Sequence, residues 1–177
     1  MTRSNRIVSL GKRLIKAGIG HFGFDVVRRK NDPLQTLIGL RSRPIRTVID
    51  VGANAGQFAK GISAFFPTAK IYCFEPVPEA YELLSSWGKT REGRVIACNH
   101  CIGDRDGEVE MFLHEEHTPS SSLLATTELT KQYYPATKKQ RRICAKQKTL
   151  DNVLDELEAD LSLEIIVKLD VQGYEKH

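Results

Sequence analysis

Apolar residues of this chain gather in short runs that alternate with segments of helical spacing. From Arg46 onward, four runs have the length of buried strands, and the segments between or before them place apolar residues on one helical face. This alternation predicts an α/β fold with a doubly wound, mainly parallel sheet. The predicted strands are Thr47–Val51, Ile71–Phe74, Arg94–Cys98 and Glu164–Leu169, and the predicted helices are Gly56–Phe66, Pro78–Trp87 and Thr149–Leu157.

One segment departs from this alternation. Asp106 and Gly107 form a typical turn pair, and the apolar residues that follow, Val109, Met111 and Leu113, alternate with polar ones. Because a turn pair next to a pattern of period two is typical of a β-hairpin, we expect the apolar run before the turn to pair with the strand after it.

Charge is distributed unevenly along the chain. The total is 26 Lys and Arg against 22 Asp and Glu, but residues 1–46 contain eleven of these cations and only two acids. Apolar residues recur there at helical spacing, which predicts a basic helical arm over residues 1–45, followed by the main domain over residues 46–177. The apolar side of this helix either packs on the domain or contacts an anionic membrane surface. The basic cluster Lys138–Lys148 has no interleaved aromatic residues, so we expect no nucleic-acid partner.

The chain shows no segment of about 18 consecutive apolar residues, the length that a membrane span requires. Its first residues are too interrupted by Lys and Arg for a secretory signal. The four cysteines are few for a chain of this length, and three of them lie in apolar surroundings, so we expect reduced thiols. These features predict a cytoplasmic protein.

Polar residues and glycines follow the predicted strands. In a doubly wound sheet, ligands bind beyond the carboxyl ends of the strands, so these residues are candidates for a site. Gly52 allows a tight turn after the first strand, Gly56 lets the next helix start close to the strand and to a ligand, and Asn54 tolerates a left-handed conformation. Glu75 ends the second strand, where it is positioned to accept hydrogen bonds from both hydroxyls of a ribose. The pattern therefore predicts a nucleoside-containing cofactor.

The first turn also bears on which cofactor is bound. The NAD fingerprint G-x-G-x-x-G places a pyrophosphate against backbone amides at a helix N-terminus. Here Asp50 heads the turn, and Asn54 takes the place of the middle glycine. Because an acid repels a pyrophosphate and attracts an ammonium group, the turn favours S-adenosyl-L-methionine, which has an ammonium, a sulfonium and no phosphate. An NAD-binding Rossmann domain is the alternative.

Six motifs, in order, resemble one family: VIDVGANAGQF, IYCFEPVPEAYELL, IGDRDGEVEMFL, SSSLL, TLDNVL and VKLDVQGYE. They are similar to the FkbM family of S-adenosylmethionine-dependent methyltransferases. The resemblance implies a class I methyltransferase (Rossmann-like) fold and methyl transfer to a hydroxyl of a sugar, glycan or natural product. It also implies a cofactor loop at Asp50, Gly52, Asn54, Gly56, Gln57 and Phe58, a ribose acid at Glu75 beside Pro76, an adenine-binding segment at Ile102, Gly103 and Asp104, and contact of Asp170 with the methyl donor and the acceptor hydroxyl.

Methyl transfer to a hydroxyl needs a group that takes up the hydroxyl proton. Asp170 is the candidate base, although it could instead orient the cofactor or cap the strand end. The histidines His100, His114 and His117 are substitutes for this role. The run Ser120–Ser122 either contacts the acceptor or is ordinary loop sequence.

A zinc site is the competing interpretation of one cluster. The spacing of Cys98, Cys101, His114 and His117 falls one residue short of a zinc-finger pattern. A zinc finger also needs a helix before its first histidine, where this sequence predicts a strand. We therefore expect no metal.

The chain ends at His177, shortly after the fourth predicted strand. The usual extent of the family implies further strands, so we expect an incomplete methyltransferase domain with its C-terminal strands missing, and a homodimer through the exposed sheet edge. Two hypotheses follow: an O-methyltransferase that acts on a small-molecule or glycan acceptor, or an inactive remnant that binds the nucleoside cofactor.

Overall fold

The structure is a computed structural model that describes residues 37, 39–40, 42–114, 132–133, 139–162 and 164–172. The chain divides into two compact units, Met1–Ile38 and Gly39–His177, and every labelled element lies in the second. Most of the predicted arm over residues 1–45 lies outside the described residues, as do His117 and the run Ser120–Ser122. The arm and its boundary therefore stay predictions. Among the described residues, no helix has the length and apolar character that a membrane span needs.

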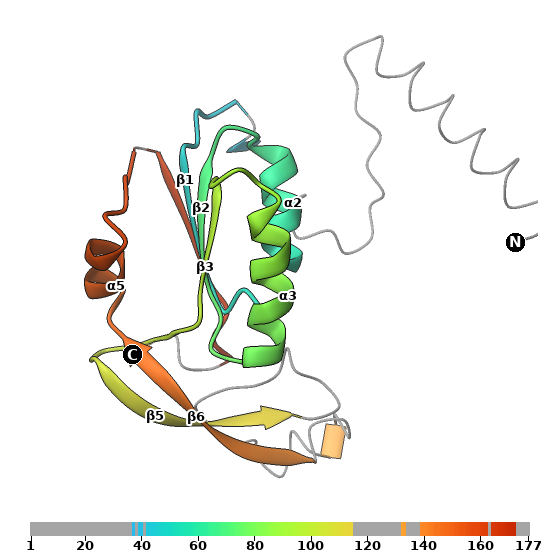
Figure 1. The fold of residues 1–177 in the computed structure, drawn as a ribbon. Coiled ribbons are helices and arrows are strands. Elements are labelled where there is room, and N and C mark those ends of the chain that lie inside the picture. The colour runs from blue at the N-terminus through green and yellow to red at the C-terminus, as the bar shows by residue number, and fades with distance from the viewer. Residues whose placement is uncertain are drawn as a thin grey trace, which may run out of the picture. The chain divides into compact units, whose positions relative to one another are not determined.

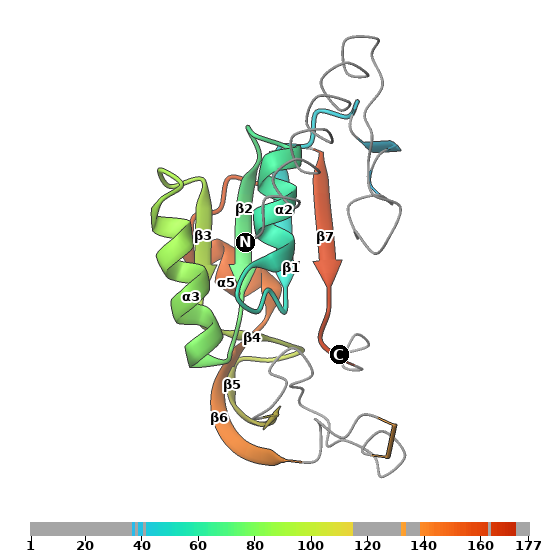
Figure 2. The same cartoon turned by 90° about the vertical axis from the view of Figure 1, so that its right-hand side faces the viewer.

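The main sheet contains four parallel strands in the order β3-β2-β1-β7 (Figures 1 and 2). In the register of the sheet, Val51 at the end of β1 pairs with Phe74 of β2 and with Leu169 of β7, so the carboxyl ends of these strands meet at one edge. The predicted α/β fold with a mainly parallel sheet is confirmed. The bounds are β1 Thr47–Val51, β2 Lys70–Phe74, β3 Val95–Cys98 and β7 Ile165–Leu169.

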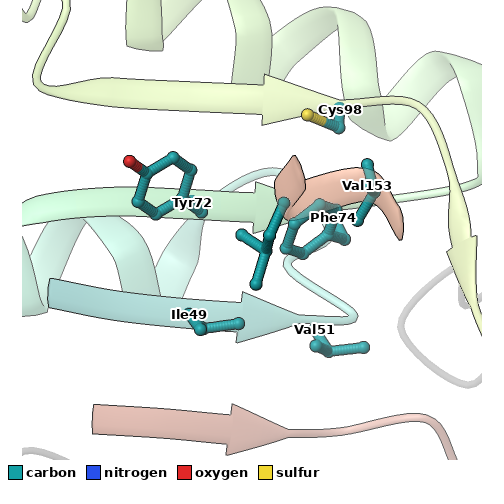
Figure 3. Packing of buried hydrophobic residues seen from close by; sticks show 7 residues of the cluster. Ile49, Val51, Tyr72, Phe74, Cys98 and Val153 are labelled. Carbon is teal, nitrogen blue, oxygen red and sulfur yellow. The ribbon is translucent and has the colours of Figure 1, made fainter. Parts of the chain in front are cut away.

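Helices cover both faces of this sheet (Figure 1). On one face lie α2 (Gln57–Phe65) and α3 (Pro78–Lys89), and on the other lies α5 (Leu150–Glu156). Apolar side chains of the sheet and of α5 form a core between them, as Figure 3 shows. Its buried members are Ile49, Val51, Tyr72, Phe74, Cys98, Val153 and Leu154.

A second sheet has the order β4-β6-β5 and shows that the predicted hairpin is wrong. Its strands are β4 (Cys101–Ile102), β5 (Gly107–His114) and β6 (Gln140–Lys148). The strand before the turn does not pair with β5, because β6 lies between them, parallel to β4 and antiparallel to β5. The sequence of β6 looks like a basic cluster, yet every second residue from Ile143 to Gln147 is at least half-buried. The second sheet packs its apolar face against the start of α3.

Strand β7 is the outer strand of the main sheet among the residues that the structure describes. The side chains of Ile165, Val167 and Leu169 are exposed, by 38%, 51% and 52%. The register pairs Val167 with Ile49 and Leu169 with Val51, so these side chains continue the face that α5 covers elsewhere.

Candidate functional site

The turn between β1 and α2 has the left-handed backbone that its sequence predicts. The φ angles are +73° at Gly52, +49° at Asn54 and +81° at Gly56. A Cβ atom at Gly52 would lie 2.1 Å from the backbone oxygen of Asp170, so the turn runs directly against the end of β7. The expected reason for Gly56 needs correction: a Cβ atom there would meet Leu84 of α3 at 2.9 Å, and the close neighbour is a helix instead of the strand.

Glu75 at the end of β2 binds the backbone of this turn. One carboxylate oxygen accepts a hydrogen bond from the Asn54 N–H at 2.7 Å, and the other accepts one from the Val77 N–H at 2.9 Å. The residue is 4% exposed. Burial raises the pKa of Glu75, while the two backbone donors and Lys168 work against that rise. Each oxygen keeps a further acceptor site, so the ribose contact stays a prediction.

The Asn99 side chain holds the backbone that follows Glu75. Its amide nitrogen Nδ2 donates to the carbonyl oxygens of Glu75 at 2.8 Å and Pro76 at 3.1 Å. Asn99 directly follows β3 and is one of the polar residues that come after the predicted strands, but it is not among the predicted site residues. Its position after a buried strand is the signal that points to it.

Asp50 is fully buried, with an exposed fraction of 0%, and its counter-ion is Lys168 of β7. The Lys168 ammonium lies 3.0 Å from the Asp50 carboxylate and donates to the Gly52 carbonyl oxygen at 2.8 Å. Burial raises the pKa of Asp50, and the charge of Lys168 counters that rise. A ligand ammonium would reach Asp50 only if Lys168 moved aside, so the predicted direct contact stays a prediction.

Lys168 is the residue that inspection of the sequence misses. It pairs with Asp50 across β1 and β7, in register, although 118 positions separate them in sequence. A lysine inside an otherwise apolar strand was the available signal, because a charge on a buried strand requires a partner. The ammonium group also lies 5.9 Å from the centre of the Phe58 ring and 3.5 Å from the Asp170 carboxylate.

Asp170 is the most exposed carboxylate of this group, with a side chain 52% exposed. Its backbone N–H donates to the Val51 carbonyl at 3.1 Å, which places it beside the turn, and its carboxylate accepts from Gln172 at 2.7 Å. Gln57 is exposed at the start of α2, where its amide donates to the Asn54 side chain at 3.1 Å. The turn, Glu75 and Asp170 therefore share one edge of the main sheet.

The predicted adenine-binding segment, Ile102 to Asp104, lies at the junction with the second sheet. The Gly103 N–H donates to the Lys148 carbonyl at 3.0 Å, and the Asp104 carboxylate accepts from the Gln147 amide at 3.3 Å. A Cβ atom at Gly103 would lie 2.0 Å from the Gln147 side chain. Asp104 is exposed, and its contact with an adenine stays a prediction.

Two of the candidate histidines, His100 and His114, have described positions. The charges that act on the His100 imidazole belong to Lys148, Glu156, Lys146 and Asp106, and burial lowers its pKa. His114 is buried in β5 next to Gln140, at 3.3 Å. Their role as substitutes for Asp170 stays a prediction. Across the described part of the chain, no group of three His, Cys, Asp or Glu residues is arranged to hold a metal ion.

A parallel sheet in the order β3-β2-β1-β7, with a glycine turn and acidic residues at its carboxyl edge, is a Rossmann-like α/β architecture, in which ligands generally bind at that edge. Comparison with known families matches the FkbM methyltransferase domain to residues 50–177. The chain therefore belongs to the FkbM methyltransferase family.

One curated relative supports this membership. Methyltransferase sdnD of Sordaria araneosa is 28% identical over an alignment of 166 residues. The match covers 81% of this chain and 62% of that protein. The chain thus spans less than two thirds of the length of this relative. No solved structure matches the chain significantly.

Proposed function

We propose that this protein binds S-adenosyl-L-methionine and transfers its methyl group to a hydroxyl of a sugar, glycan or natural product. The observation that carries the proposal is the turn at Gly52–Gly56, tied to Glu75 through the Asn54 N–H and lying against Asp170, in a chain of a methyltransferase family. A Cβ atom at Gly52 would collide with β7, so the turn needs this glycine in order to lie close to the strand.

The charges around the turn support a cofactor without phosphates. Beside the Asp50–Lys168 pair, Glu75 and Asp170 contribute two further carboxylates, against the ammonium group of Lys60, which donates to the Ala55 carbonyl at 2.7 Å. Opposite charges within a few ångströms favour binding, whereas a pyrophosphate beside an excess of carboxylates is disfavoured. This balance supports S-adenosyl-L-methionine over NAD.

The residues divide the proposed chemistry among them. Bound S-adenosyl-L-methionine supplies an electrophilic methyl group on a sulfonium. Glu75 would accept from the ribose hydroxyls, the segment Ile102–Asp104 would hold the adenine, and the turn would hold the methionine part of the cofactor. Asp170 would take up the proton of the acceptor hydroxyl as the methyl group is transferred to its oxygen. By holding donor and acceptor together, these residues would supply most of the acceleration.

Calorimetry on the purified chain with S-adenosyl-L-methionine, and separately with NAD, tests the cofactor. We expect S-adenosyl-L-methionine to bind more tightly, and tighter binding of NAD would refute the proposal. Formation of S-adenosylhomocysteine with a panel of glycans then tests transfer. Binding of the cofactor without any product would favour the inactive, nucleoside-binding remnant.

A further inference from the structure

The Lys168 ammonium joins two parts of the candidate site. It donates to the carbonyl oxygen of Gly52 at 2.8 Å, pairs with the Asp50 carboxylate at 3.0 Å and lies 3.5 Å from the Asp170 carboxylate. We propose that Lys168 is a positioning residue of the methyl-donor site, which fixes the Gly52–Gly56 turn relative to Asp170. The inference about the methyl donor rests on the proposed function, whereas the inference about the turn does not.

The geometry of the strands makes Lys168 suitable for this role. Its backbone pairs directly with Asp50, and its side chain extends to the carboxyl edge of the sheet, where the backbone of β1 turns into the left-handed conformation. An ammonium group has three donors, and three groups of β1 and its turn lie within reach: the Asp50 carboxylate and the carbonyl oxygens of Val51 and Gly52. One side chain of β7 therefore holds the end of β1.

Stability alone is a poor explanation for this pair. Asp50 is 0% exposed and Lys168 is 22% exposed, so both charges have lost most of their water. The desolvation of a buried ion pair often cancels its attraction, and in some proteins such pairs instead select one specific conformation. Here the selected conformation is the one in which the turn lies against Asp170.

Loss of Lys168 should change how the protein responds to pH. The titratable groups that face Asp50 are Lys168 and Asp170 from β7 and its end, and Cys73 and Glu75 from β2 and its end. The raised pKa of Asp50 means that its protonated form favours the folded state, and this contribution is lost as the pH rises through the folded pKa. Without Lys168 this pKa rises further, so in a Lys168→Met variant the loss of stability with rising pH continues to a higher pH.

Hydrogen exchange followed by mass spectrometry tests the positioning of the turn without any ligand. In Lys168→Met we expect the amides of residues 52–56 to exchange at least about tenfold faster than in the natural chain, the scale of one lost hydrogen bond to a charged group. Lys168→Arg should restore part of the protection. Lys70→Met is the matched control, since Lys70 is a partly buried lysine at the opposite end of neighbouring β2. Unchanged exchange in Lys168→Met would overturn the proposal.

The pH dependence of the melting temperature tests the pairing of Lys168 with Asp50. The difference between the natural chain and Lys168→Met should be larger at pH 8 than at pH 5, and Asp50→Asn in the Lys168→Met background should remove that dependence. A difference that is the same at both pH values contradicts the assigned pairing. If Lys168→Met fails to fold, the Asp50→Asn/Lys168→Met chain serves for the exchange experiment.

Calorimetry separates this inference from the proposed function. We expect Lys168→Met to bind S-adenosyl-L-methionine at least about tenfold more weakly, with Lys70→Met unchanged. If the natural chain does not bind this cofactor while the turn still loosens in Lys168→Met, the proposed function fails and the positioning role stands. If the natural chain binds it and Lys168→Met binds equally well with equal exchange, the positioning role fails and the proposed function stands.

Discussion

Replacing Gly52 by alanine tests how closely the β1 turn approaches β7. Gly52 has a φ of +73°, and an added Cβ atom would lie 2.1 Å from the Asp170 backbone oxygen, far inside the 3.0 Å that such contacts respect. The obstacle is a backbone atom, so no side-chain rotation relieves it. The ends of β1 and β7 must separate, which strains the hydrogen bond from the Asp170 N–H to the Val51 carbonyl at 3.1 Å.

Gly52→Ala lowers the free energy of unfolding in two ways, through backbone strain and through a steric clash, and a second glycine separates them. A left-handed conformation costs a non-glycine residue about 1–2 kcal/mol, and an atom forced into a packed site typically costs about 1–3 kcal/mol more. Gly93 has a nearly equal φ of +77°, but no atom lies within 4 Å of its added Cβ. Gly93→Ala therefore has the first cost alone. The unfolded-state effect of alanine is shared by the two variants, so their difference reports the steric contact with β7.

Urea unfolding, followed by circular dichroism and by the fluorescence of Trp87, measures this difference. With a denaturant dependence of about 1–3 kcal/mol per molar urea, the Gly52→Ala midpoint should lie about 1 M below that of Gly93→Ala. Equal midpoints for the two variants would show that the turn and β7 are farther apart than the structure places them. Gly52→Ala should also weaken binding of S-adenosyl-L-methionine, which Gly93→Ala should leave unchanged.

Three further predictions concern the site and its surroundings. Asp170→Asn should lower kcat by a factor of about 10²–10⁴ with little change in the affinity for the methyl donor. Asp160→Asn, at an exposed acid outside the site, should change neither quantity. An unchanged kcat in Asp170→Asn would show that Asp170 is not the base. Asn99→Asp should destabilise the fold at pH 7 by about 2–3 kcal/mol, because an ionised carboxylate would face two carbonyl oxygens. The loss should be smaller at pH 4, where a protonated carboxyl donates to one of these oxygens. Equal losses in urea unfolding at the two pH values would contradict this prediction. Alkylation at pH 8 should label Cys144 alone in the native chain and all four cysteines after unfolding. The reason is that burial raises the pKa of Cys98 and of Cys101 to about 11. Early labelling of either residue, detected by mass spectrometry, would contradict their burial.

The main sheet could be predicted because its strands are apolar on both faces. Strand β1 has the predicted bounds, and β2, β3 and β7 differ from them by one residue at their starts. The turn was equally accessible, since few residues besides glycine and asparagine adopt a positive φ. These features depend on local sequence, which is why inspection of the chain suffices for them.

The second sheet could not be predicted in the same way, because its central strand has a solvent-facing side rich in cations. In β6 the exposed Arg142 and Lys146 hide the alternation of Ile143, Ala145 and Gln147. A turn pair at Asp106–Gly107 normally indicates that its neighbours pair with each other. Here the paired residues of β5 and β6 lie between 26 and 40 positions apart in sequence, and a local pattern contains no information about such a partner.

The charge of the site also depends on a contact between residues that are distant in sequence, which a local pattern does not reveal. An acid at the head of a glycine turn suggests a cationic ligand only while its own counter-ion is unknown. Asp50 has that counter-ion within the protein, because the register of β1 and β7 places Lys168 directly beside it. The proposed preference for a cationic ligand therefore depends on Glu75 and Asp170, of which Asp170 is open to solvent. Asp50 can therefore influence the ligand through the conformation of the turn. Removing Lys168 should lower the affinity for the ligand by more than removing one charge at an exposed position would, because solvent and salt screen an exposed charge.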